Sequence, residues 1–356
     1  MGTRPNVVWI LGSGFSRSLG GPLLYDLLSE LGSAETAARF PTLKMAGVYN
    51  LFEMHRAGSL RQRPPYWKHA EEFLSFVDGA VPESSNRHKI VKELITPWAS
   101  DETPLLTPES FRDRCAQAIA AECLFTLGAK PLQLETWAPY LQWACFRSDN
   151  DTIITFNYDL VLETIGSIPD IRSFGAPSVL IPDPNGTLQG LRGAAGVTNI
   201  LKMHGSVDWV DAGGKIERKP DVEATLRSGQ VPLIGTPGPT KSLRRNGHFA
   251  PIWNEAEDRL RAADVIVFMG YRFPPSDSEA RSAILRAIRE NIQPYLRVRT
   301  VLGPRTGEDD TVRLQRLLTL TLQGAGRRIY SGGRDMSYDL IAETLYAEDL
   351  MSTLTN

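Results

Sequence analysis

A short apolar run that ends abruptly on polar residues constrains the fold of this chain most. Residues 152–156 are β-branched or aromatic, which predicts a buried strand, and Asn157, Tyr158 and Asp159 follow at once. Open α/β sheets bind their ligands at the carboxyl ends of central strands, so this stretch predicts a binding edge. The alternative is that Asn157 and Asp159 cap the helical pattern that comes next, as Asn and Asp often do.

Other apolar runs end in the same manner. Residues 7–11 lead into a glycine turn, residues 199–203 end at His204, and residues 265–269 run into Gly270. A last strand is expected at residues 298–302. Helical patterns separate these strands, and the alternation predicts an α/β fold with a Rossmann-like, doubly wound parallel sheet.

A large helical insertion is expected after the first βα unit. Residues 33–150 show amphipathic helical spacing and little strand pattern. The expected division is therefore a core of residues 1–32 and 151–356 and a small domain of residues 33–150. Its tryptophans are expected to be core or interface anchors: Trp67, Trp98, Trp137 and Trp143.

Composition limits the classes of partner. Lys and Arg number 39 and Asp and Glu 41, for a net charge of -2, so direct nucleic-acid binding is not expected. The first residues lack a signal-peptide pattern, and no segment approaches the ~18 apolar residues of a membrane span. We expect a cytoplasmic protein without membrane contact.

The three cysteines favour core packing over metal binding. Cys115, Cys123 and Cys145 form no CxxC pair and have no His at metal-ligand spacing. Cys115 and Cys123 share one helical face with Phe111 and Ile119, which predicts that both are buried.

The first glycine turn has the form of a phosphate cradle. Gly12 and Gly14 would let the backbone approach a pyrophosphate, with Ser16 beside them. An ordinary tight turn is the alternative, and Arg17 stands where the dinucleotide fingerprint has its third glycine. A helical Leu pattern at residues 23–31 predicts the helix that follows.

His204 is a candidate functional residue from its context. It is one of five histidines, it ends a strand, and Gly205 follows it, which lets backbone and ligand come close. Residues 182–186 predict the tip of a hairpin. Residues 211–249 are polar and rich in Gly and Pro, and are expected to form loops that could cover a cleft.

Taken in order, the four strand ends resemble the sirtuin family, the silent-information-regulator type of NAD-consuming protein. Residues 12–16 are similar to its GAGxS loop, and Thr155, Asn157 and Asp159 match its TxNxD stretch in register. His204 and Gly205 match its HG pair, and residues 270–272 resemble the late glycine turn that holds the cofactor. Residues 30–150 lie outside the resemblance.

Two departures point to one branch of this family. No cysteine follows Cys145, so the two CxxC pairs of zinc-bearing deacylases are missing, and residues 20–23 replace the GIPDFRS segment. The pattern is closer to the zinc-free sirtuin-like proteins of bacterial anti-phage defence. That resemblance implies hydrolysis of NAD, no zinc, a homo-oligomer, and activation by a partner such as a HerA-type ATPase or an Argonaute-like protein.

The resemblance also implies roles for single residues. Asn157 would hold the ribose hydroxyls and the attacking water, Asp159 would contact the carboxamide of nicotinamide, and His204 would be the general base. The remaining implied contacts to NAD come from these residues: Gly12, Gly14, Ser16, Thr155, Gly270 and Arg272. Arg17 and Asp277 are further candidates, for which, as for Arg272, a surface or capping role is the alternative.

Two other functions stay open. The first is an NAD-dependent protein-lysine deacylase, against which the missing zinc cysteines count. The second is a non-catalytic sensor of NAD or ADP-ribose, although binding alone requires neither Asn157 nor His204.

Overall fold

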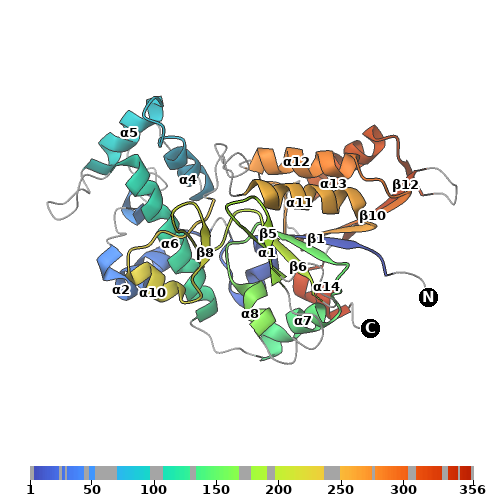
Figure 1. The fold of residues 1–356 in the computed structure, drawn as a ribbon, viewed down its shortest axis with the longest axis horizontal. Coiled ribbons are helices and arrows are strands. Elements are labelled where there is room, and N and C mark those ends of the chain that lie inside the picture. Colours follow the sequence, from blue (N-terminus) through green and yellow to red (C-terminus); the bar gives the residue numbers. More distant parts are fainter. Residues whose placement is uncertain are drawn as a thin grey trace.

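The structure is a computed structural model with an eight-stranded parallel sheet at its centre (Figure 1). It describes residues 4–23, 26–28, 30–43, 48–52, 70–96, 107–128, 134–167, 178–190, 197–235, 249–274, 277–303, 310–330, 336–343 and 345–353. The strands of the sheet are β1 (Val7–Leu11), β2 (Thr152–Thr155), β3 (Ser178–Val179), β6 (Asn199–Lys202), β9 (Val265–Met269), β10 (Tyr295–Val301), β11 (Arg328–Ile329) and β12 (Ser337–Glu343).

The strand order confirms the predicted α/β, Rossmann-like sheet. Across the sheet the order is β11-β12-β10-β9-β1-β2-β6-β3. Without the short strands β3 and β11, the chain order is 3-2-1-4-5-6, that of doubly wound dinucleotide-binding sheets. In such sheets the winding direction reverses between the first and fourth strands, and here these are β1 and β9.

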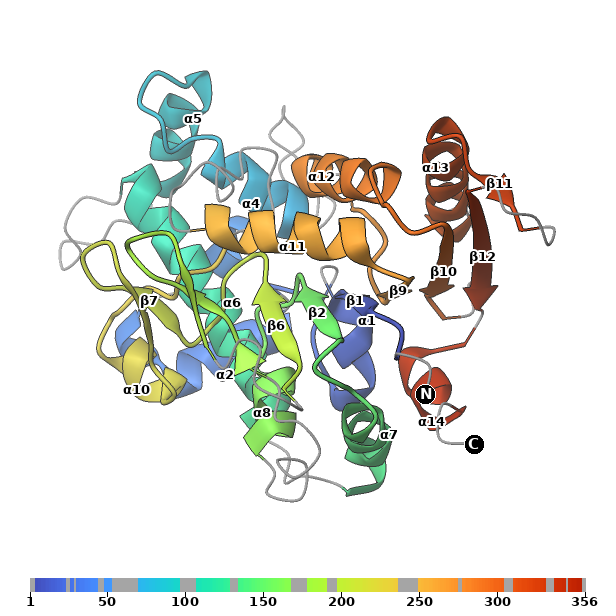
Figure 2. The same cartoon turned by 45° about the vertical axis from the view of Figure 1, so that its right-hand side comes forward.

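Helices cover both faces of the sheet (Figure 2). Along β1, Val8 and Ile10 face one core cluster, whereas Trp9 and Leu11 face another, as the two-residue period of a strand requires. The first cluster is closed by α11 (Ala250–Ala262), α12 (Ser278–Arg289) and α13 (Asp310–Gly324). The second is closed by α1 (Ser13–Ser16), α7 (Leu134–Cys145), α8 (Val161–Ser167) and α14 (Ala347–Thr353).

A third apolar cluster belongs to a group of helices beside the sheet, on the left in Figure 1. Its elements between β1 and β2 are α2 (Glu30–Arg39), the 3-10 turn η2 (Pro41–Leu43), α4 (Ala70–Asp78), α5 (Asn86–Ile95) and α6 (Pro108–Gly128). Cys115 and Cys123 lie buried in this cluster, as predicted. The predicted domain boundaries remain a prediction. Helix α7 lies within residues 33–150 but packs on the sheet, and α10 (Val222–Arg227) lies outside them but packs on the helices.

A buried carboxyl group ties this helical group to the segment after β1. Both oxygens of Glu122, in α6, accept from the backbone N–H of Leu28, at 3.1 and 3.0 Å, and Oε1 also accepts from the Tyr49 hydroxyl. Burial raises the pKa of Glu122 to about 7, against the lowering effect of these hydrogen bonds. The carboxyl group therefore joins three segments of the helical group.

The helix predicted over residues 23–31 is wrong in its position. The chain becomes helical directly after β1, in α1 and the 3-10 turn η1 (Arg17–Leu19), and Gly20 ends this turn with φ +91°. Residues 26–28 form a turn, and α2 begins at Glu30. Gly20, Gly21 and Pro22 explain the interruption, because glycine and proline both disfavour helix continuation.

Two other expectations need correction. Residues 298–302 do not supply the last strand, because β12 follows and pairs with β10 along its whole length. Residues 211–235 are not all loop, since the hairpin of β7 (Trp209–Asp211) and β8 (Ile216–Arg218) and the helix α10 lie there. Residues 236–248 lie outside the described part of the chain.

Several local predictions are confirmed. Residues 182–186 form the tip of the hairpin between β4 (Ile181–Pro182) and β5 (Leu188–Gln189). Trp137 and Trp143 are buried against the sheet. Trp67 and Trp98 lie outside the described residues.

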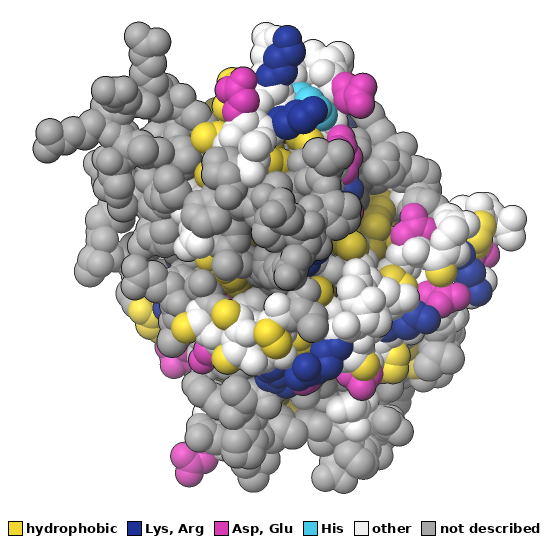
Figure 3. Space-filling view, turned by 90° about the vertical axis from the view of Figure 1, so that its left-hand side faces the viewer, with side chains coloured by type: hydrophobic (Ala, Val, Ile, Leu, Met, Phe, Trp, Pro, Cys, Tyr) yellow, Lys and Arg dark blue, Asp and Glu magenta, His cyan; other side chains and the backbone are white. Residues whose placement is uncertain are grey.

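The visible surface carries charges of both signs. On the face drawn in Figure 3, the coloured Lys and Arg side chains lie among Asp and Glu side chains. Within the described ranges, no helix has the length and apolarity needed to cross a membrane.

Three glycines let the loops after β1 and β9 touch. The N–H of Gly12 donates to Met269 O at 3.1 Å, and that of Gly14 donates to Gly270 O at 3.3 Å. A Cβ added to Gly14 would lie 2.8 Å from Gly270 Cα, and one added to Gly270 would lie 2.5 Å from Phe15 N. Side chains at these positions would therefore separate the two loops.

We predict that Gly270→Ala destabilises the protein much more than Gly213→Ala. Both glycines have φ +68°, but a Cβ at Gly213 would meet nothing within 4 Å. The left-handed conformation alone costs Ala roughly 1–2 kcal/mol, and overpacking at Gly270 adds about 1–3 kcal/mol. Urea denaturation measures both free energies of unfolding, and equal losses would show that the loop contact contributes nothing.

Candidate active site

The four strand ends singled out from the sequence lie side by side. β6, β2, β1 and β9 are consecutive in the sheet and parallel, so their carboxyl ends share one edge. Tyr158, just beyond β2, packs against the helical group, so this edge faces the α2–α6 helices. The edge therefore gathers residues from distant parts of the sequence.

Asn157 is held by hydrogen bonds across the strand ends. Its amide nitrogen donates to Gly12 O at 3.1 Å and to Ser16 Oγ at 3.0 Å, and its backbone N–H donates to Thr155 Oγ1 at 3.1 Å. The side chain is 9% exposed. Because both amide hydrogens are used, Oδ1 is the side-chain atom that can accept from a ligand or water.

Asp159 both caps a helix and joins this network. Its Oδ1 accepts from the backbone N–H of Val161 at 3.1 Å, where α8 begins, and its Oδ2 accepts from Ser16 Oγ at 2.7 Å. The capping interpretation is thus correct for Asp159. Asn157 instead bonds to the β1 loop. Ser16 links the two residues, accepting from one and donating to the other.

The predicted phosphate cradle already has protein partners for two of its amides. The N–H of Gly14 donates to Gly270 O, and the N–H of Phe15 donates to Gly12 O at 2.8 Å. The glycines are needed first for the contact between the loops, and the contact of Gly12, Gly14 and Gly270 with NAD stays a prediction.

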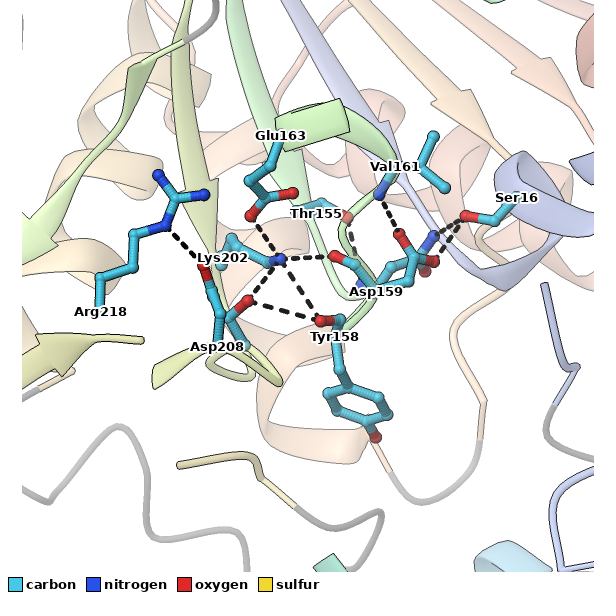
Figure 4. Close-up of polar contacts among 11 residues, drawn as sticks. Ser16, Thr155, Tyr158, Asp159, Val161, Glu163, Lys202, Asp208 and Arg218 are labelled. Carbon is cyan, nitrogen blue, oxygen red and sulfur yellow. Dashed lines mark hydrogen bonds and ion pairs between the residues drawn. The ribbon is translucent and has the colours of Figure 1, made fainter. Parts of the chain in front are cut away.

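A buried lysine, Lys202 at the end of β6, holds the loop that carries Asn157 and Asp159. Its Nζ donates to Asp159 O at 2.6 Å, Glu163 Oε1 at 2.8 Å and Ser206 Oγ at 2.8 Å (Figure 4). The Lys202 and Glu163 side chains are 1% and 7% exposed. Burial raises the pKa of Glu163 while the Lys202 charge lowers it. The ammonium group thereby fixes the backbone at Asp159.

His204 lies beside a second carboxylate in an aromatic setting. It is 3% exposed, and its Nε2 lies 3.7 Å from Oδ1 of Asp277. Its ring makes an edge contact with Phe156, at 4.9 Å between centroids, and Tyr158 lies 6.3 Å away. These contacts join the ends of β6 and β2 to the start of α12.

The two candidate arginines donate to protein groups. Nη2 of Arg272 donates to Leu302 O at 2.6 Å, and Arg313 donates to the carbonyl oxygens of Arg272 and Phe273. Arg17 pairs with Asp26 at an exposed position, which fits the surface alternative. The residue after Arg272, Phe273, is buried with φ +53°, so the turn after β9 is strained and held from α13.

Two functional candidates carry weak signals in the sequence. Lys202 lies within a predicted strand, and a lysine inside an apolar strand is a usable signal because it must find buried partners. Asp277 gave no signal of its link to His204, since the two are far apart in the sequence. No group of three or more His, Cys, Asp or Glu side chains suited to a metal ion occurs among the residues that the structure describes.

Comparison with known proteins adds no family. A scan against protein-family models finds no match for this chain, and a search of curated proteins finds none.

We predict that Lys202→Met lowers the free energy of unfolding by about 3–5 kcal/mol, because the substitution leaves Glu163 buried without a cation. The matched control is Lys219→Met. Lys219 contacts Glu217 at 2.9 Å, close to the 2.8 Å of Lys202 and Glu163, but its pair is 38% and 41% exposed. Exposed pairs contribute under about 1 kcal/mol. Similar small losses in both variants, measured by urea denaturation, would contradict the role given to Lys202.

Proposed function

We propose that this chain is an NAD⁺ hydrolase that cleaves the nicotinamide–ribose bond to give nicotinamide and ADP-ribose. The observation that carries the proposal is that Ser16, Asn157 and Asp159 bond to one another and that a buried His204 follows the next strand, so that all four lie at the ends of the adjacent strands β1, β2 and β6. The position of Ser16 at the β1–β9 reversal supports it, because doubly wound sheets bind dinucleotides there. The resemblance of the same segments to zinc-free sirtuin-like proteins supplies the choice of NAD.

The proposed reaction is a displacement at C1′ of the nicotinamide ribose. The C1′–N bond breaks, nicotinamide leaves with the bonding electrons, and positive charge develops on the ribose, as in glycoside hydrolysis. A water oxygen forms the new bond to C1′, and His204 accepts the proton that this water loses. The products are nicotinamide, ADP-ribose and one proton.

Each polar group has a task in this reaction. Oδ1 of Asn157 would accept from a ribose hydroxyl or from the attacking water, in an orientation that Gly12 and Ser16 maintain. Asp159 would keep Ser16 and the first turn of α8 in place. One of its carboxylate oxygens accepts from the Ser16 hydroxyl, and the other accepts from the N–H of Val161 at the start of α8. Its contact with the carboxamide, and those of Thr155 and Arg272 with NAD, remain predictions from the resemblance.

In the cell we propose that the chain is the NAD-depleting effector of an anti-phage defence system. An enzyme that drains NAD harms its host when always active, so control by a partner or by assembly is expected. A HerA-type ATPase, an Argonaute-like protein and a homo-oligomer remain the proposed means of activation.

We predict that His204→Ala and Asn157→Ala each lower NAD turnover, by roughly 10²–10⁴-fold for the base and about 10²-fold for the positioning amide. The assay separates nicotinamide, ADP-ribose and acyl-ADP-ribose, with and without an acetyl-lysine peptide. Peptide-independent ADP-ribose is the expected product. Peptide-dependent acyl-ADP-ribose would instead indicate a deacylase, and tight NAD binding without turnover would indicate a sensor.

Two substitutions serve as matched controls. Asn199 is a buried asparagine at the opposite, amino end of β6, and His88 is a half-buried histidine of α5. Asn199→Ala and His88→Ala are expected to keep turnover close to that of the unchanged protein. Near-normal turnover in His204→Ala or Asn157→Ala would contradict the assignment of these residues.

A further inference from the structure

The side chains of His204 and Asp277 form a buried pair that links β6 to α12. Nε2 of His204 and Oδ1 of Asp277 are 3.7 Å apart, and the residues are 3% and 5% exposed. This separation is longer than a hydrogen bond, as is common for a catalytic pair before its substrate binds. Both residues carry ionisable side chains and are almost fully buried, so the charges that they carry must be compensated by nearby groups.

The geometry around Asp277 fixes how its carboxylate is used. Oδ2 accepts from the Tyr271 hydroxyl at 3.2 Å, which leaves Oδ1 on the side of His204. Asp277 directly precedes α12, but its side chain does not cap this helix. A carboxylate at this position can only accept hydrogen bonds.

Aromatic packing restricts both members of the pair. Phe156 stacks on the Tyr271 ring, with centroids 4.1 Å apart and planes 9° from parallel, and its edge contact holds the His204 ring. Phe156 therefore lies against both the imidazole and the tyrosine that holds Asp277.

From this geometry we infer that Asp277 is the positioning residue of His204, holding the proton on Nε2 so that Nδ1 carries the lone pair. A carboxylate that accepts from one ring nitrogen determines the tautomer of a neutral histidine. Asp277 itself does not contact the reacting atoms. The catalytic role of this pair rests on the proposed hydrolase function. In that function, Nδ1 of His204 takes the proton from water or from a ribose hydroxyl.

The tautomer of His204 can be measured without any activity. Nitrogen-15 labelling of histidine and long-range proton–nitrogen correlation spectra distinguish Nε2–H from Nδ1–H, and His204→Ala identifies the resonances. The spectra are recorded over a pH series and the tautomer is read where the nitrogen shifts show a neutral ring, because an imidazolium carries protons on both nitrogens. The expected result is Nε2–H, and finding the proton on Nδ1 in the unchanged protein overturns the inference.

Asp277→Asn tests the cause of the tautomer. In this variant the Tyr271 hydroxyl still donates to the side-chain oxygen of the new asparagine, so the side-chain nitrogen faces His204. The His204 ring must then accept a hydrogen bond through Nε2 and carry its proton on Nδ1. We predict this reversal together with a fall of about 10²-fold or more in kcat, and little change in KM, because the inferred role of Asp277 is exercised through His204. Tyr271→Phe is the matched control. It removes only the hydroxyl and is expected to keep the Nε2–H tautomer.

The outcomes separate this inference from the proposed function. An unchanged tautomer in folded Asp277→Asn overturns the pairing, whatever the turnover of NAD. Absence of NAD turnover in the unchanged protein even when it is assembled with its activating partner, with the tautomer reversing as predicted, upholds the pairing and contradicts the hydrolase. The tautomer of the unchanged protein still decides the matter if the variant fails to fold.

Discussion

The contact between the loops after β1 and β9 is the constraint on which the site depends. These strands are neighbours in the sheet although most of the chain separates them, and they are the pair at which the winding of the sheet reverses. Gly14 and Gly270 approach so closely that neither tolerates a Cβ. The contact brings Ser16 to one side of the reversal and the turn of residues 270–274 to the other.

From this contact a continuous series of polar interactions runs along the strand ends. Gly12 O accepts from Asn157, Ser16 bridges Asn157 and Asp159, and the backbone of Asp159 accepts from Lys202. Lys202 in turn pairs with Glu163. Buried polar groups are stable only when their partners are in place, so each member fixes the next. The amide of Asn157 is thus oriented before any ligand arrives, which is what a positioning role requires.

The sequence was sufficient for the central strands of the sheet and for the meeting of four strand ends at one edge. Strong apolar runs such as residues 265–269 predict buried strands, and strand ends of a parallel sheet must share an edge. It was insufficient where local signals are weak or mixed. β12 alternates poorly between buried and exposed residues, and the glycines and proline at residues 20–22 displaced the first helix from its expected position. The pairing of His204 with Asp277 depends on strand order alone, which no local pattern encodes.

The most direct test of the account is hydrogen exchange of His204→Ala with and without NAD, because this variant should bind the dinucleotide without consuming it. The account predicts slower amide exchange in four segments at one edge of the sheet: residues 12–16, 157–161, 203–207 and 270–274. Protection of all four on NAD binding would establish that they form a single dinucleotide site. NAD binding that protects only the α2–α6 helices, or leaves these four segments unchanged, would contradict the account.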